Sequence, residues 1–285
     1  MRTDAVRVNL RPLILASVLW AAIGAEFAAA EQLPPDEPGA PARLNSSPRH
    51  GEWVDVPLPG SATPIRSFVV YPERRDNAPV VIVIQEIYGL TDWIRGVADQ
   101  LAADGFIAVA PDMLSGMGPG GGGTAAYATR DDVVAGVRTL TPVESMRRLD
   151  AVFAYARTIP AGSGNIGVVG YCWGGGMSFA YAAHQPGVGA AVVYYGTSPA
   201  DAAAYGGLRA PVLGLYGEDD QRVNATIPTA RDAMGPLGKT YEVEIYPGAG
   251  HGFLRAQADR EGANLRATQQ AWPRTVAFFR EHLGG

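Results

Sequence analysis

The residue best suited to nucleophilic chemistry in this sequence is Cys172, the only cysteine of the chain. It stands in the run Gly-Tyr-Cys-Trp-Gly over residues 170–174, between apolar residues and a helical pattern. A nucleophile flanked in this way between a strand and a helix predicts a sharp turn, in which glycines leave room for the backbone. The side chain then projects from the end of the sheet, and the helix N-terminus favours a thiolate. The alternative is a small buried hydrophobic residue, as many free cysteines are.

Two later loops hold the acid and the base that such a nucleophile needs. Of the four histidines, only His251 lies in a loop after a predicted strand, with glycines beside it; the alternative is a histidine that caps a turn. The loop after the preceding predicted strand contains Asp219 and Asp220. We favour Asp220 as the residue that orients the imidazole, because Val223 can anchor its loop under the sheet. Asp219, or a solvated acidic turn, is the alternative.

These three positions need a scaffold, and the rest of the chain predicts an α/β fold. Several apolar runs lack polar alternates, as expected when helices cover both faces of a parallel sheet. The pattern predicts one domain, residues 51–285, with a mostly parallel, doubly wound sheet and helices on both faces. Strands are expected over residues 65–71, 80–85, 106–110, 166–169, 190–195, 212–216 and 241–246. Helices are expected over residues 93–103, 144–157, 175–184, 229–234 and 267–283.

One stretch interrupts the alternation, from residue 113 to about residue 140. Its length predicts a loop or cap that covers the edge of the sheet where ligands bind. Four glycines at residues 120–123 are consistent with a hinge. A phosphate cradle would need a following Gly-Lys-Ser/Thr, which this stretch does not contain.

The N-terminus has the pattern of a secretory signal peptide over residues 1–30, with arginines before an apolar run and small residues at its end. An uncleaved membrane anchor is the alternative, although the run is short for a span. Residues 31–50 are rich in proline and small polar residues, which predicts a flexible linker. We therefore expect an exported protein, periplasmic or secreted, without stable membrane association after cleavage.

Composition narrows the function further. A formal net charge of -5 argues against nucleic-acid binding, which needs clustered positive charge. A single cysteine excludes an internal disulfide, a redox pair and a thiolate zinc cluster, and Lys239 as the only lysine lies in an exposed-looking turn unsuited to a Schiff base. We expect a monomer that acts on a small molecule without a metal or cofactor.

Three segments, residues 170–172, 85–89 and 250–253, resemble the dienelactone hydrolase family of α/β-hydrolases. The resemblance covers most of the chain after the predicted signal peptide and implies a Cys172-His251-Asp220 triad that opens an enol-lactone through a thiol ester. It also implies that Glu86 contacts the resting thiol. From the residues alone, a structural role for Glu86 is an equal alternative.

The resemblance implies further roles around the nucleophile. Backbone N–H groups of Ile87 and Trp173 would form the oxyanion hole. Arg255, four residues beyond the histidine, would bind a substrate carboxylate and so favour anionic lactones; a solvated surface arginine is the alternative. A second arginine comes from the cap, where Arg130 and Arg138 are both candidates, and Arg138 is our prediction.

The sequence thus predicts a carboxylic ester or lactone hydrolase. Two alternatives share the fold: an exported general carboxylesterase, and a binding protein for anionic ligands that has lost turnover. A thiol peroxidase is a weaker alternative, because no second cysteine is available to resolve an oxidised thiol.

Overall fold

The computed structural model describes residues 33–74 and 77–284. The predicted signal peptide, residues 1–30, lies outside these residues. Among the helices that are described, none has both the length and the apolar character required to cross a membrane.

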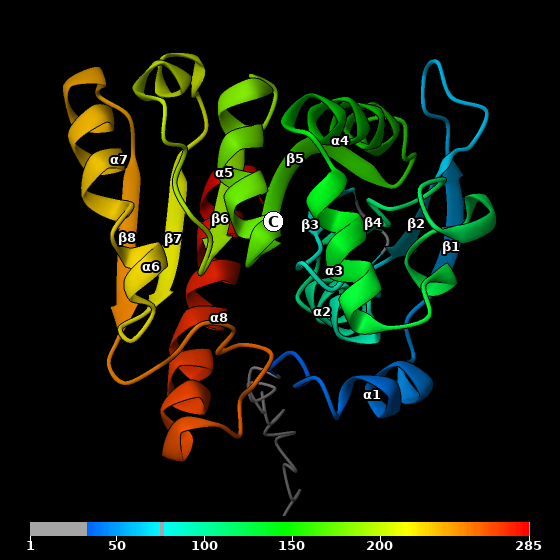
Figure 1. Cartoon of the computed structure of the whole chain (residues 1–285), viewed down its shortest axis with the longest axis horizontal. Helices are drawn as coiled ribbons and strands as arrows, with labels where there is room; N and C mark the ends of the chain where they lie inside the picture. The colour runs from blue at the N-terminus through cyan, green and yellow to red at the C-terminus, as the bar shows by residue number, and fades with distance from the viewer. Residues whose placement is uncertain (1–32, 75–76, 285) are drawn as a thin grey trace, which may run out of the picture. The chain divides into compact units, whose positions relative to one another are not determined.

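A sheet of eight strands forms the centre of the domain, in the order β1-β2-β4-β3-β5-β6-β7-β8. β1 pairs antiparallel with β2, and β2 with β4, while all other neighbours are parallel. Figure 1 shows β1 and β8 at opposite edges of the sheet. The strands are β1 (Gly51–Val56), β2 (Ile65–Val70), β3 (Ala78–Ile84), β4 (Ile107–Pro111), β5 (Gly162–Tyr171), β6 (Ala190–Tyr194), β7 (Val212–Gly217) and β8 (Tyr241–Tyr246).

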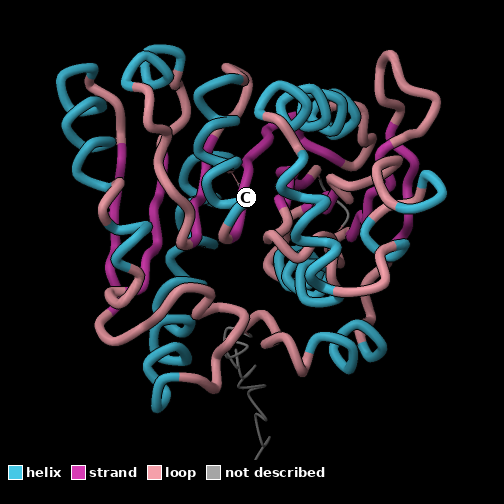
Figure 2. Tube along the Cα trace, viewed as in Figure 1, coloured by secondary structure: helices cyan, strands magenta, loops and turns pink. Residues whose placement is uncertain are grey.

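Helices pack on both faces of the sheet, as the uninterrupted apolar strands predicted (Figure 2). In β3, Val80 and Ile82 belong to one hydrophobic core, whereas Val81 and Val83 belong to the other. The first core also contains side chains of α3 (Arg130–Thr139), α4 (Pro142–Ala156), α5 (Trp173–His184), α6 (Gln221–Asn224) and α7 (Ile227–Met234). The second contains side chains of α1 (Ala40–Ser46), α2 (Asp92–Ala103) and α8 (Ala263–Leu283).

The predicted α/β architecture is confirmed, and each predicted strand and helix has a counterpart. The sequence reading missed β1, α1, α3 and the single turn of α6. The expected linker is corrected from residue 33 onward, because it contains α1, whose Ala40 is fully buried against α2. The cap contains two short 3-10 turns and α3, which begins with a capping box between Thr129 and Asp132.

The order of the parallel strands determines where the candidate residues meet. β3, β5, β6, β7 and β8 are consecutive neighbours, so their carboxyl ends lie at one edge of the sheet. Glu86 follows β3, Cys172 follows β5, Asp220 follows β7 and His251 follows β8. Ligands of open α/β sheets bind at this edge.

Candidate active site

Cys172 occupies the sharp turn between β5 and α5. Its backbone has φ 56° and ψ −116°, a conformation that residues with a Cβ rarely adopt. The backbone N–H of Cys172 donates to the carbonyl of Tyr194 at 3.1 Å, and its carbonyl accepts from Gly175 at 3.0 Å. A strained conformation of this kind costs about 1–3 kcal/mol and occurs mainly at functional sites. The geometry therefore favours a nucleophile over a buried hydrophobic residue.

The glycines on either side of Cys172 are required by close backbone approaches. A Cβ at Gly170 would overlap the carbonyl oxygen of Gly174, and one at Gly174 would overlap the carbonyl oxygen of Gln85. No other residue type fits either position without moving β3 or α5. The Gly-x-Cys-x-Gly spacing is thus explained by packing around the turn.

His251 and Asp220 form the hydrogen-bonded pair that the sequence predicted. The His251 Nδ1 and Asp220 Oδ2 atoms are 2.5 Å apart, and the Asp220 side chain is buried. Asp219 instead pairs with Arg260 on the surface, so the structure brings only one of the two adjacent acids to the imidazole. Burial opposes the charge of the ring, but Asp220 and the neighbouring thiol of Cys172 outweigh it and raise the pKa of His251 to about 9.

The two expected oxyanion donors line the same cavity as Cys172. This cavity has a volume of about 650 Å³, and Ile87 and Trp173 form part of its wall. Neither backbone N–H of these two residues donates a hydrogen bond within the described part of the chain. Trp173 is the first residue of α5, where amides have no partner inside the helix.

Glu86 lies buried at the end of β3 and forms an ion pair with Arg255. The Glu86 Oε2 and Arg255 Nε atoms are 2.9 Å apart, although the N–H direction does not satisfy hydrogen-bond geometry. Burial raises the pKa of Glu86 to about 7, and Arg255 limits the rise. Such a carboxyl group exchanges its proton near neutral pH, which suits a residue in an active site.

The three candidate arginines are not equivalent. Arg255 contacts Glu86 and also Glu37, a residue of the segment that precedes α1. Arg130 contacts the same Glu37 carboxylate. Arg138 lines the Cys172 cavity from α3, and no contact in the described residues links it to Arg255.

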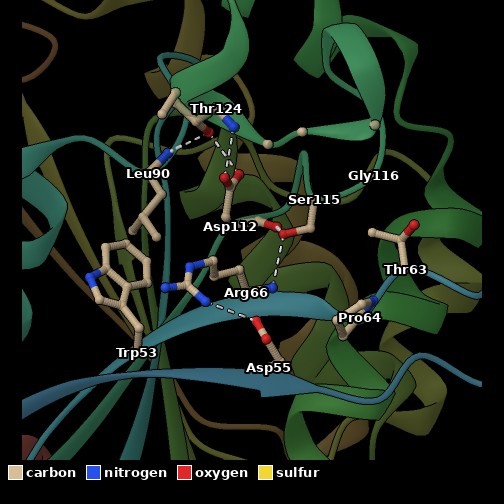
Figure 3. Close-up of a pocket in the computed structure, with 14 residues that line it drawn as sticks. Trp53, Asp55, Thr63, Pro64, Arg66, Leu90, Asp112, Ser115, Gly116 and Thr124 are labelled. Atoms are coloured by element: carbon tan, nitrogen blue, oxygen red, sulfur yellow. Dashed lines mark hydrogen bonds and ion pairs between the residues drawn. The ribbon is translucent and has the colours of Figure 1, made fainter.

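A second cavity, of about 330 Å³, lies between the antiparallel strands and the cap (Figure 3). Its polar groups already have partners: Arg66 pairs with Asp55, and Asp112 accepts from the N–H and hydroxyl of Thr124. Neither histidine nor cysteine is among the residues described as lining it. The Cys172 cavity is therefore the candidate active site.

Sequence reasoning missed three residues near this site. Tyr195, with φ 38°, follows β6, lines the Cys172 cavity and meets the ring of His251 edge-on at 5.2 Å between centroids. The sequence feature that could have identified Tyr195 is its position at the end of a predicted strand. Arg222, two residues after Asp220, also lines the cavity. Glu37 carried no signal, because its partners lie far away in the sequence.

Comparisons with known proteins agree with this geometry. The sequence profile of the dienelactone hydrolase family matches residues 65–283. A protein of Methylorubrum extorquens named "Putative carboxymethylenebutenolidase" is 34% identical over 244 residues, 80% of each chain. A protein of the same name from Escherichia coli K12 is 30% identical, over 81% of this chain and 87% of its own.

Solved structures resemble the fold as well. The crystal structure titled "Putative Dienelactone Hydrolase" from Klebsiella pneumoniae superposes with a TM-score of 0.71 at 29% identity, over 82% of this chain and 99% of its own. Together with the family profile, these relatives identify the chain as a hydrolase of lactone- or ester-like substrates that belongs to the dienelactone hydrolase family.

Proposed function

We propose that the protein opens lactones or esters by covalent catalysis, with Cys172 as nucleophile, His251 as acid and base, and Asp220 as the residue that orients His251. The observation that carries the proposal is the 2.5 Å contact between His251 Nδ1 and Asp220 Oδ2, beside a cysteine in a strained turn. The chain order nucleophile, acid, base is the order found in α/β-hydrolases.

In the first half of the reaction, the Cys172 thiolate attacks the substrate carbonyl carbon and forms the C–S bond. The carbonyl oxygen becomes an oxyanion, which the N–H groups of Ile87 and Trp173 stabilise; loss of one such donor costs about 2.7–4 kcal/mol. Collapse of the intermediate breaks the ester C–O bond, and protonated His251 gives its proton to the departing alkoxide. In a lactone, that alkoxide stays tethered to the acyl group.

In the second half, His251 takes a proton from water, and the hydroxide attacks the thiol ester carbonyl. The C–S bond breaks, Cys172 leaves as thiolate, and the product is a carboxylic acid. We propose that Glu86 contacts the resting thiol and exchanges a proton with it, since its pKa of about 7 lies near neutral pH. The buried ion pair with Arg255 then holds Glu86 in position.

Acylation of Cys172 provides the decisive test. Wild-type enzyme mixed rapidly with p-nitrophenyl acetate should show by mass spectrometry one acetyl group, which peptide mapping assigns to Cys172. Cys172→Ala should show neither adduct nor turnover, with an unchanged circular dichroism spectrum. Cys172→Ser keeps a nucleophile but should turn over poorly, because its hydroxyl needs a stronger base than a site tuned for a thiolate. Full turnover by the alanine variant would refute the proposal, and binding of substrate without an adduct would favour a binding protein.

We also propose that the enzyme works outside the cytoplasm, because residues 1–30 have the features of a secretory signal. N-terminal sequencing of protein from the periplasmic or culture fraction tests this. A mature chain that starts near Glu31 supports export, whereas an intact Met1 in the cytoplasmic fraction contradicts it.

A further inference from the structure

The carboxylate of Glu37 lies between two arginines near the active site. Its Oε2 atom is 2.6 Å from Nη1 of Arg255, and its Oε1 atom is 3.2 Å from Nη2 of Arg130. The backbone N–H of Glu37 also donates to the carbonyl of Arg255 at 3.0 Å. One internal carboxylate thus bridges two guanidinium groups, an arrangement that proteins commonly use to hold a bound carboxylate ligand.

The segment before α1 is anchored so that Glu37 is held in this place. Buried Trp93 of α2 donates its indole N–H to the carbonyl of Pro35 at 2.9 Å. Gln257 donates to the carbonyl of Pro34 at the same distance. Gly96 of α2 completes the fit, since a Cβ there would lie 2.7 Å from Cγ of Pro35. These anchors fix the backbone immediately before Glu37.

The two arginines belong to the surroundings of the active site. The guanidinium of Arg130 lies over the ring of Tyr88, 3.5 Å from its centroid, and that of Arg255 lies 5.3 Å from the same centroid. Tyr88 is the neighbour of Ile87, which lines the Cys172 cavity. Glu37 lies between Arg255 and Arg130, with Glu86 on the other side of Arg255, so the Glu37 carboxylate neutralises positive charge that an acidic substrate would otherwise meet at this arginine pair.

We propose that Glu37 determines substrate charge: it occupies Arg130 and Arg255 as an internal carboxylate and makes the enzyme prefer neutral esters and lactones over anionic ones. This inference rests on the proposed esterase function. An anionic substrate must displace Glu37 to reach the two arginines, whereas a neutral substrate has no such competitor. Removal of the Glu37 charge frees the arginine pair for a substrate carboxylate.

The test compares p-nitrophenyl butyrate with mono-p-nitrophenyl glutarate, a neutral and an anionic ester with the same leaving group. Glu37→Gln should raise the ratio of kcat/KM for the anionic over the neutral ester by about tenfold, the effect of 1.4 kcal/mol, mainly through a lower KM. Asp36→Asn is the matched control, because it removes the same charge from the neighbouring residue, whose Oδ1 accepts from the backbone N–H of Gly39 and has no ion pair among the described residues. Its ratio should stay within about twofold of wild type, since Asp36 is partly exposed and solvent screens its charge. Adding Arg130→Gln to Glu37→Gln should cancel the gain.

Two results would overturn the proposal. One is an active Glu37→Gln enzyme with an unchanged ratio. The other is a wild-type preference for the anionic ester that Arg138→Gln or Arg222→Gln abolishes; these arginines line the Cys172 cavity and form no ion pair in the part of the chain that the structure describes.

Failure of the esterase proposal itself would look different, because wild type would then hydrolyse neither ester. In that case, calorimetric titration with glutarate tests Glu37 separately. Binding about tenfold tighter to Glu37→Gln than to wild type and to Asp36→Asn would support the role of Glu37. Equal binding to all three proteins would refute it.

Discussion

The carboxylate of Glu86 lies 2.9 Å from Nε of Arg255, and its side chain is only 3% exposed. A buried carboxylate is costly unless a partner compensates for the lost water. Here the compensation is incomplete, because burial still raises the pKa of Glu86 to about 7 despite Arg255. The ionised form of Glu86 is therefore maintained at a cost to the fold, at the edge of the sheet where Cys172 and His251 meet.

Glu86→Gln should change how stability depends on pH. Between pH 4.5 and 7, folded wild type keeps a proton on Glu86 that the unfolded chain has released, so its stability falls as pH rises through this window. Glutamine cannot ionise, so the free energy of unfolding of the variant should rise by about 3 kcal/mol relative to that of wild type between pH 4.5 and pH 7. Urea unfolding at pH 4.5 and pH 8 measures the change. Glu281→Gln, at an exposed position on α8, is the control. The prediction would be contradicted if the free energy of unfolding differed between wild type and Glu86→Gln by the same amount at both pH values.

The adjacent acids Asp219 and Asp220 provide a matched pair of variants. Asp220→Asn should lower kcat by about 10²–10⁴-fold, because an amide cannot hold the imidazole in the required tautomer and charge state. Asp219→Asn should leave kcat within about twofold, because this acid pairs with Arg260 on the surface. Steady-state kinetics on p-nitrophenyl acetate measures both. Equal losses in the two variants would remove Asp220 from its proposed role.

The pH profile of kcat/KM should have an alkaline limb near pH 9. His251 is protonated below this value and must give its proton to the leaving group, so activity falls as pH rises through about 9. Loss of the Asp220 charge removes a group that raises the pKa of His251, so Asp220→Asn should move the limb to lower pH. Residual activity measured from pH 6 to 10 tests this. A limb at the same pH in both proteins would mean that another group titrates there.

The glycines at the turn should be intolerant of even one methyl group. Gly170→Ala should destabilise the protein by about 3 kcal/mol, because its Cβ overlaps the Gly174 carbonyl and neither β5 nor α5 can move freely. Gly206→Ala is the control, since no atom lies within 4 Å of a Cβ built there. Urea denaturation at pH 7 gives both values. A Gly170→Ala protein as stable as Gly206→Ala would show that the turn relaxes.

The features that could be predicted from the sequence are those with a short-range motif or a periodic pattern. The elbow around Cys172 and the loop of His251 follow apolar strands, and parallel strand order then brings them together. The preference for Asp220 over Asp219 rested on the position of Val223, which is fully buried. The ion pairs of Glu37 could not be read, because they join residues 93 and 218 positions apart through the packing of α1 on α2. The strand Gly51–Val56 was missed because its residue types do not follow its burial: Trp53 is exposed, whereas Glu52 lies on the more buried side.

Trp173 follows the nucleophile directly and forms part of the wall of its cavity. Trp93 and Trp272 are both at most 1% exposed, and Trp53 lies on the surface. Of the four tryptophans that the structure describes, only Trp173 lines this cavity, so a ligand bound there contacts its indole. Indole emission depends on the polarity of its surroundings. The enzyme therefore contains its own fluorescent reporter, through which occupancy of the cavity can be followed in stopped-flow experiments without a chromogenic substrate or an attached dye.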